Sequence, residues 1–182
     1  MLQLITQDFD LPVPLLEAKL HLRVDHDDED LMIDSYIRAA SARLDGPDGY
    51  LGRCLTPKVW RLGLNQLRGT ITLPLPPCQE VASITYVDRN GDVQTLANAS
   101  YRVSGIGDVA CITPIEAWPD TDSTSITFTA GYTVVPDPIR AAILLRVAHM
   151  YEHRESVVIG ESVAGLPLGE DDLLRNFRLW SF

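Results

Sequence analysis

The hydrophobic pattern changes twice along this chain, and this feature constrains the fold most strongly. Between residues 14 and 45, apolar residues recur with helical spacing. From about residue 57 to 133 the chain consists of short β-rich runs, and helical spacing returns at 136. Short, closely spaced strands favour antiparallel pairing. The sequence therefore predicts an α+β fold with a helical core from both chain ends and an inserted antiparallel β segment.

The same pattern divides the chain into three segments. We expect residues 1–56 to form the N-terminal helical part of the core, and 57–133 an inserted β subdomain. Residues 134–182 would add the C-terminal helical part and a partner-docking tail. Within the β segment, Asn90 and Gly91 separate two β-rich runs and predict a hairpin. The helix that begins near Pro136 is apolar almost all round, which predicts a central position.

Acidic charge is concentrated near the N-terminus. The 182 residues have a formal net charge of −10, and residues 1–50 alone hold 11 acidic and 4 basic side chains. The run DHDDED at 25–30 fits the start of a helix, where carboxylates stabilise the positive end of the helix dipole. Tight nucleic-acid binding needs clustered Lys and Arg, so this balance argues against it. No apolar stretch reaches the ~20 residues of a membrane span.

One motif has an enzymatic pattern. His149, Glu152 and His153 spell HxxEH, in which two His on one helix face bind zinc and the Glu acts as base. A zinc-dependent hydrolase is therefore the alternative function. It would need a third ligand downstream, and Glu155, Glu161 and Glu170 are the candidates. The competing interpretation is helix packing and surface ion pairs, with no metal or cofactor and no enzymatic activity.

The end of the chain is rich in aromatic and arginine side chains, a composition typical of protein interfaces. The candidate partner-binding residues are Arg175, Phe177, Arg178, Leu179, Trp180 and Phe182. The alternative is that this tail folds back on its own core. A third function class, a small-ligand module built on the β segment, would require converging polar groups that the sequence does not display.

Five stretches together resemble the phage head–tail connector family (adaptor, or head-completion, proteins) of long-tailed phages and phage-derived gene transfer agents. They are LEAKLHLRVDHDDEDLMIDSYIRAASARLD (16–45), GRCLTPKVWRL (52–62), LPLPPCQEVASITYVDRNGDVQTL (73–96), FTAGYTVVPDPIRAAILLRVAHMYEHRES (128–156) and LPLGEDDLLRNFR (166–178). No single stretch is diagnostic, and the resemblance depends on their combination, order and spacing.

The resemblance implies a non-enzymatic structural subunit that binds copies of itself in a ring, usually of about twelve. Such a ring lies beneath the portal protein in the neck of a virion or virus-like particle assembled in the bacterial cytoplasm. It joins the DNA-filled head to a stopper or tail protein, and DNA passes through it without specific binding. The tail residues at 175–182 would be the portal-docking element.

Overall fold

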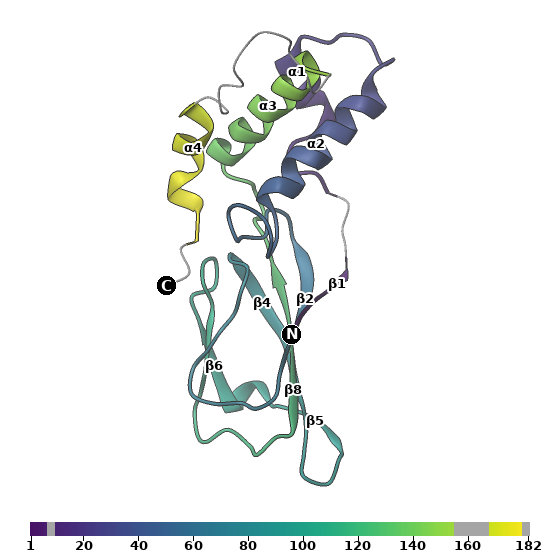
Figure 1. Cartoon of the computed structure of the whole chain (residues 1–182). Helices are drawn as coiled ribbons and strands as arrows, with labels where there is room; N and C mark the ends of the chain where they lie inside the picture. Colours follow the sequence, from purple (N-terminus) through teal and green to yellow (C-terminus); the bar gives the residue numbers. More distant parts are fainter. Residues whose placement is uncertain (7–9, 155–167, 180–182) are drawn as a thin grey trace. The chain divides into compact units, whose positions relative to one another are not determined.

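The computed structural model describes residues 1–6, 10–154 and 168–179 of the chain. These residues form two compact units, each with its own hydrophobic core. The β unit comprises 1–9 and 56–133, and the helical unit comprises 10–55 and 134–182. Figure 1 shows both units, coloured along the sequence.

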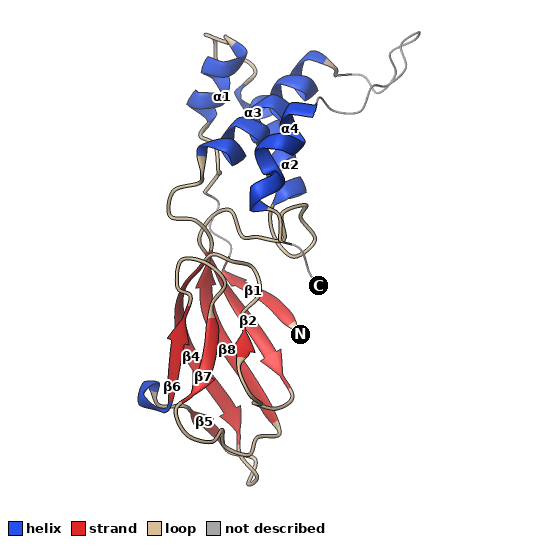
Figure 2. Ribbon diagram, turned by 90° about the vertical axis from the view of Figure 1, so that its left-hand side faces the viewer, coloured by secondary structure: helices blue, strands red, loops and turns tan. Residues whose placement is uncertain are grey.

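The β unit contains two antiparallel sheets (Figure 2). The larger has the strand order β1-β2-β8-β4-β5, with β1 at Leu2–Thr6, β2 at Lys58–Leu64, β4 at Cys78–Val87, β5 at Val93–Thr95 and β8 at Ser123–Ala130. The smaller has the order β3-β7-β6, with β3 at Ile71–Thr72, β6 at Tyr101–Ser104 and β7 at Cys111–Pro114. A short 3-10 helix, Asn98–Ser100, precedes β6. The prediction of antiparallel pairing is confirmed.

The core of the β unit follows from the alternation of side chains along its strands. In β8, Ile126, Phe128 and Ala130 are fully buried, whereas the residues between them are only half-buried. Successive side chains of a strand point to opposite faces, so one face of β8 faces the core. The smaller sheet contributes Tyr101 and Ile112 to the buried set. The β unit therefore has an apolar interior of its own.

The predicted hairpin is confirmed. Strands β4 and β5 pair antiparallel in the register Val87↔Val93. The Asp88 carboxylate accepts hydrogen bonds from the backbone N–H groups of Asn90 and Asp92 at 2.8 and 3.0 Å. These amides hold the pKa of Asp88 below its usual value. Gly91 has a φ of 89°, a left-handed conformation that glycine adopts without steric cost.

The helical unit contains α1 (Leu15–Leu22), α2 (Asp30–Leu44), α3 (Asp137–Glu152) and α4 (Leu168–Leu174), followed by a 3-10 turn at Arg175–Phe177. Helix α3 packs against each of the other three, which confirms its predicted central position. Its buried face carries Ile139, Ile143 and Val147. Helix α2 presents Ile33 and Ile37 to the same core.

The predicted architecture, a helical core from both chain ends with an inserted antiparallel β segment, is wrong as stated. The helices do not form the core of the protein, because the strands bury an apolar interior of their own. Nor is the β part a single insertion, since β1, at the very start of the chain, pairs with β2 in register Leu2↔Leu62. The fold is a mixed α+β arrangement with one helical unit and two antiparallel sheets.

Two further expectations concern the division of the chain into segments and the presence of membrane-spanning helices. The division into an N-terminal helical part (1–56), a β subdomain (57–133) and a C-terminal helical part with a docking tail (134–182) remains a proposal. As for membranes, the described part of the chain has no helix with the length and apolar character needed to cross one.

Candidate functional site

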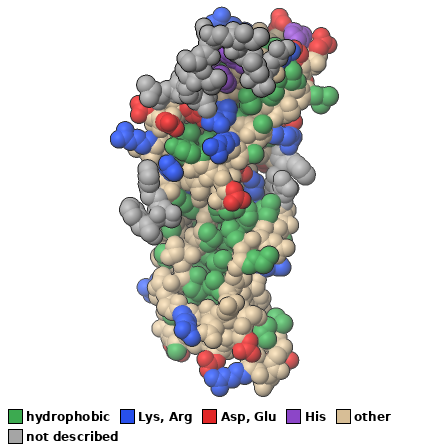
Figure 3. Space-filling model, in the orientation of Figure 1, with side chains coloured by type: hydrophobic (Ala, Val, Ile, Leu, Met, Phe, Trp, Pro, Cys, Tyr) green, Lys and Arg blue, Asp and Glu red, His purple; other side chains and the backbone are tan. Residues whose placement is uncertain are grey.

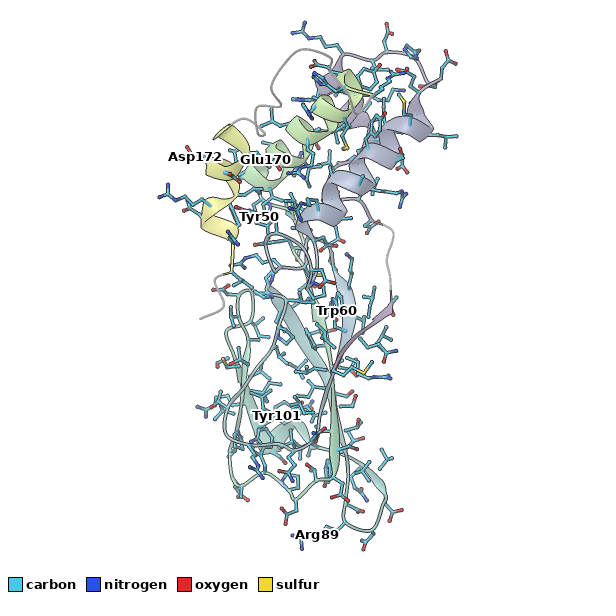
Figure 4. The ribbon with its side chains drawn as sticks, in the orientation of Figure 1. Tyr50, Trp60, Arg89, Tyr101, Glu170 and Asp172 are labelled. Atoms are coloured by element: carbon cyan, nitrogen blue, oxygen red, sulfur yellow. The ribbon has the colours of Figure 1, made fainter. Side chains whose placement is uncertain are left out.

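The C-terminal segment, which carries the predicted docking residues, is fastened to α3 by a buried ion pair. Glu170 of α4 is 5% exposed, and its Oε1 accepts hydrogen bonds from Arg146 Nη2 at 2.6 Å and Nε at 3.0 Å. Leu174, one turn further along, is 1% exposed. In Figure 4, Glu170 lies on the side of α4 towards α3 and Asp172 lies on the outer side. The Glu170 carboxylate, bonded to Arg146 of α3, and the buried Leu174 side chain thus hold α4 in place.

Beyond α4 the chain runs along the loop at 46–53 of the same unit. The Leu179 N–H donates to the Leu51 carbonyl at 3.0 Å, and Arg53 Nε donates to the Phe177 carbonyl at 2.5 Å. The Arg178 guanidinium lies over the Tyr50 ring, 4.7 Å from its centroid, in a cation–π contact. Residues up to 179 are therefore bound to their own unit.

The predicted docking residues are placed as follows. Arg175 and Arg178 are exposed, while Phe177 and Leu179 are half-buried. Trp180 and Phe182 lie outside the described residues. The structure thus brings four of the six proposed residues together on one continuous segment. Their role in portal binding remains a prediction.

Sequence reasoning missed Tyr50 and Arg53, the residues that receive this segment. They come from a loop more than a hundred residues away in the chain, and no local pattern connects the two. The buried role of Glu170 was also missed, because an acid at a helix start is fully explained by the helix dipole.

The acidic run has internal partners. Lys19 of α1 is only 9% exposed, and its Nζ lies 2.6 Å from Asp27 Oδ1 and 2.7 Å from Asp30 Oδ1. The lysine hydrogen bond lowers the pKa of Asp27, and the two carboxylates raise the pKa of Lys19. Acidic side chains gather at the end of the helical unit where the α1–α2 loop lies (Figure 3).

A third acid of this run, Glu29 at the start of α2, connects that helix to the end of α3. The Tyr151 hydroxyl donates a short hydrogen bond to Glu29 Oε2, and Arg154 Nη2 lies 2.8 Å from Glu29 Oε1. These two donors lower the pKa of Glu29, the tyrosine having the larger effect. Part of the acidic cluster therefore stabilises the helical unit itself.

The HxxEH residues do not form a zinc site among the described residues. The rings of His149 and His153 stack with centroids 4.6 Å apart, and both residues are exposed, as is Glu152. Of the candidate third ligands, Glu170 is bonded to Arg146, and Glu155 and Glu161 lie outside the described residues. Within the described ranges, no three His, Cys, Asp or Glu side chains are grouped to hold a metal.

Comparison with known proteins agrees with a structural role. Residues 13–99 match the family described as phage gp6-like head–tail connector protein. None of the curated proteins matches the chain significantly.

Solved structures match over the full chain. One is a chain of the virion of a native gene transfer agent particle, with a TM-score of 0.81 and 26% identity; the match covers 100% of this chain and 97% of that one. Another belongs to the neck of an empty gene transfer agent particle computed with C6 symmetry, with a TM-score of 0.78, 25% identity and the same coverage.

A third, from the neck of a native particle computed with C12 symmetry, has a TM-score of 0.74 at 24% identity and supports the fold alone. Three of the five stretches that carried the resemblance lie completely within the family match, and the structural matches extend across all five. The chain is thus similar to phage head–tail connector proteins over residues 13–99, and to neck and virion chains of gene transfer agent particles over its full length.

Proposed function

We infer that this chain is a structural connector subunit and that it works as one copy of a ring in the neck of a phage-like particle. The observation that carries this inference is the match of the entire chain to neck and virion chains of gene transfer agent particles, at TM-scores of 0.78 and 0.81. Six-fold symmetry in one such neck supports assembly from identical copies around a channel.

A connector needs a rigid fold and surfaces that bind its partners, and it needs no catalytic groups. The features of this chain are compatible with such a role. The one enzymatic motif lies on the exposed side of α3 with its histidines stacked on each other. The net charge of −10 also suits the wall of a DNA channel, because a surface that attracts phosphates would slow passage. We therefore propose that DNA passes through the ring without specific binding.

We further propose that residues 175–182 dock on the portal protein, while other faces meet a stopper or tail protein. The exposed side chains of Arg175 and Arg178 can pair with acidic groups of a partner, and half-buried Phe177 can add an apolar contact. Buried Glu170 and Leu174 hold the start of the segment, so little ordering entropy would be lost on docking.

The test adds purified subunit to portal-bearing heads and counts heads that retain DNA and acquire tails by electron microscopy. Without the subunit, we expect filled heads to lose DNA or remain tailless. If heads complete normally without it, the connector function is wrong.

The docking proposal is tested separately with the double variant Arg175→Glu, Arg178→Glu. It should fold like the wild type but fail to join heads. A matched control, Arg102→Glu, makes the same change at an exposed site of the β unit and should join heads normally. Wild-type joining by the double variant would show that the tail is not the docking element.

A further inference from the structure

Residues 50–53, which we call the tail-binding loop, hold the backbone of the C-terminal segment at two points. Arg53 Nε donates a hydrogen bond to the Phe177 carbonyl at 2.5 Å, and the Leu51 carbonyl accepts one from the Leu179 N–H at 3.0 Å. Both contacts involve backbone groups of the segment. The backbone is therefore held on each side of the residue between them, which limits the region that its side chain can reach.

That residue is Arg178, whose guanidinium lies over the Tyr50 ring, 4.7 Å from the centroid. The Arg178 side chain is exposed, and the Tyr50 side chain is half-buried. The Tyr50 hydroxyl is 3.4 Å from Asp171 Oδ1 of α4, and Figure 4 shows Tyr50 next to that helix. An exposed arginine is rich in rotamers, so a ring against its guanidinium narrows the directions in which the charge points.

This restriction matters for binding an acidic partner. A guanidinium donates its hydrogen bonds in its own plane and binds a carboxylate with two of them side by side, which requires a defined orientation. An arginine that is oriented before it meets its partner loses less side-chain entropy on binding. The attraction that orients Arg178 comes from the face of the aromatic ring rather than from the hydroxyl. The part of Tyr50 that acts on Arg178 is therefore its ring.

We propose that Tyr50 is a positioning residue for portal docking, and that its ring holds the Arg178 guanidinium in the orientation in which an acidic group of the portal binds it. This inference rests on the proposed docking role of residues 175–182. The expected effect follows from the strength of cation–π contacts at exposed sites, which corresponds to about a two- to five-fold change in a dissociation constant.

The experiment titrates purified subunit against portal-bearing heads and measures the concentration that gives half-maximal association. Tyr50→Leu removes the aromatic ring and should weaken association about two- to five-fold. The matched variant Tyr50→Phe keeps the ring and loses only the hydroxyl, so it should associate like the wild type. Thermal melting of both variants checks that the helical unit is folded.

A double-mutant cycle with Arg178→Met shows whether Tyr50 acts through Arg178. Arg178→Met should weaken association on its own, because it removes the charge that the partner binds. If the ring acts by orienting that charge, Tyr50→Leu should cause no further weakening in the Arg178→Met background. A residue that only stabilises the fold would have the same effect in both backgrounds.

Equal weakening by Tyr50→Leu in both backgrounds would therefore overturn the proposal, and so would a Tyr50→Phe variant as weak as Tyr50→Leu. Wild-type association of Tyr50→Leu, together with weak association of Arg178→Met, would also overturn it while leaving the docking function intact. Wild-type association of Arg178→Met would instead contradict the docking role of this arginine, and the positioning role of Tyr50 with it.

Discussion

Replacing Glu170 by Ala tests whether a single ion pair holds the C-terminal segment on its unit. The substitution removes the acceptor of two hydrogen bonds from Arg146, at 2.6 and 3.0 Å, and leaves the arginine without this partner. Breaking a fully buried ion pair costs about 3–5 kcal/mol, and one charged hydrogen bond contributes about 1.5–3 kcal/mol. The Arg146 side chain keeps 20% exposure, so we expect a loss below the range for a fully buried pair, about 2 kcal/mol.

This loss should appear as local opening rather than global unfolding. Helix α4 has 7 residues, fewer than the ~12–15 that a helix needs for marginal stability in water, so it depends on its docking contacts. A loss of 2 kcal/mol raises the population of undocked α4 about 30-fold. Buried Leu174 still favours docking, so the open state remains a minority.

The assay is hydrogen exchange measured by mass spectrometry, comparing peptides from 168–179 with peptides from 139–147 of α3. Exchange should accelerate about 30-fold in the first region and change little in the second. The control, Asp172→Ala, removes an equal charge from the same helix, where the exposed Asp172 carboxylate lies 4.0 Å from Arg175. Unchanged protection of 168–179 in Glu170→Ala, or equal loss of protection in both regions, would refute the reasoning.

Three more expectations concern acid stability, backbone geometry and metal content. The pKa of Glu29 is lowered in the folded state, so its contribution to the free energy of unfolding is present above the usual pKa of 4.5 and is lost as pH falls through the lowered pKa. Glu29→Gln should therefore make the urea midpoint fall less steeply between neutral and acid pH. An unchanged slope would disprove this. Gly131 has a φ of 131° and an added Cβ would lie 2.1 Å from a backbone oxygen, so Gly131→Ala should cost about 3 kcal/mol or more. Gly46→Ala, at a φ of 83° with open space around it, should cost only about 1–2 kcal/mol in the same denaturation assay, and equal losses would contradict the clash. Purified protein should carry background zinc by elemental analysis; stoichiometric zinc that His149→Ala removes would restore the hydrolase hypothesis.

Local features of this protein were predictable from the sequence. The hairpin at Asn90-Gly91 and the central helix α3 depend on neighbouring residues and on the spacing of apolar side chains, both of which can be read along the chain. The family was also recognisable, because the order of five stretches is itself a property of the sequence. The connector function followed from that resemblance rather than from any catalytic pattern.

Other features were decided by the tertiary structure. Leu31 of α2 is 89% exposed although leucines usually lie in a core, and Lys19 is buried where a lysine is expected in solvent. Burial depends on which elements meet, and here two carboxylates from the α1–α2 loop and α2 compensate the lysine charge.

The sequence by itself determined the change from helical to β-rich segments near residue 57 and back near residue 136, since hydrophobic period and turn chemistry are local. Only the tertiary structure decided that Leu2–Thr6 completes a sheet with Lys58–Leu64, and that Glu170 is bonded to Arg146. Both contacts join residues that no periodicity relates, and their stability comes from desolvation and hydrogen bonding, which exist only once the chain has folded.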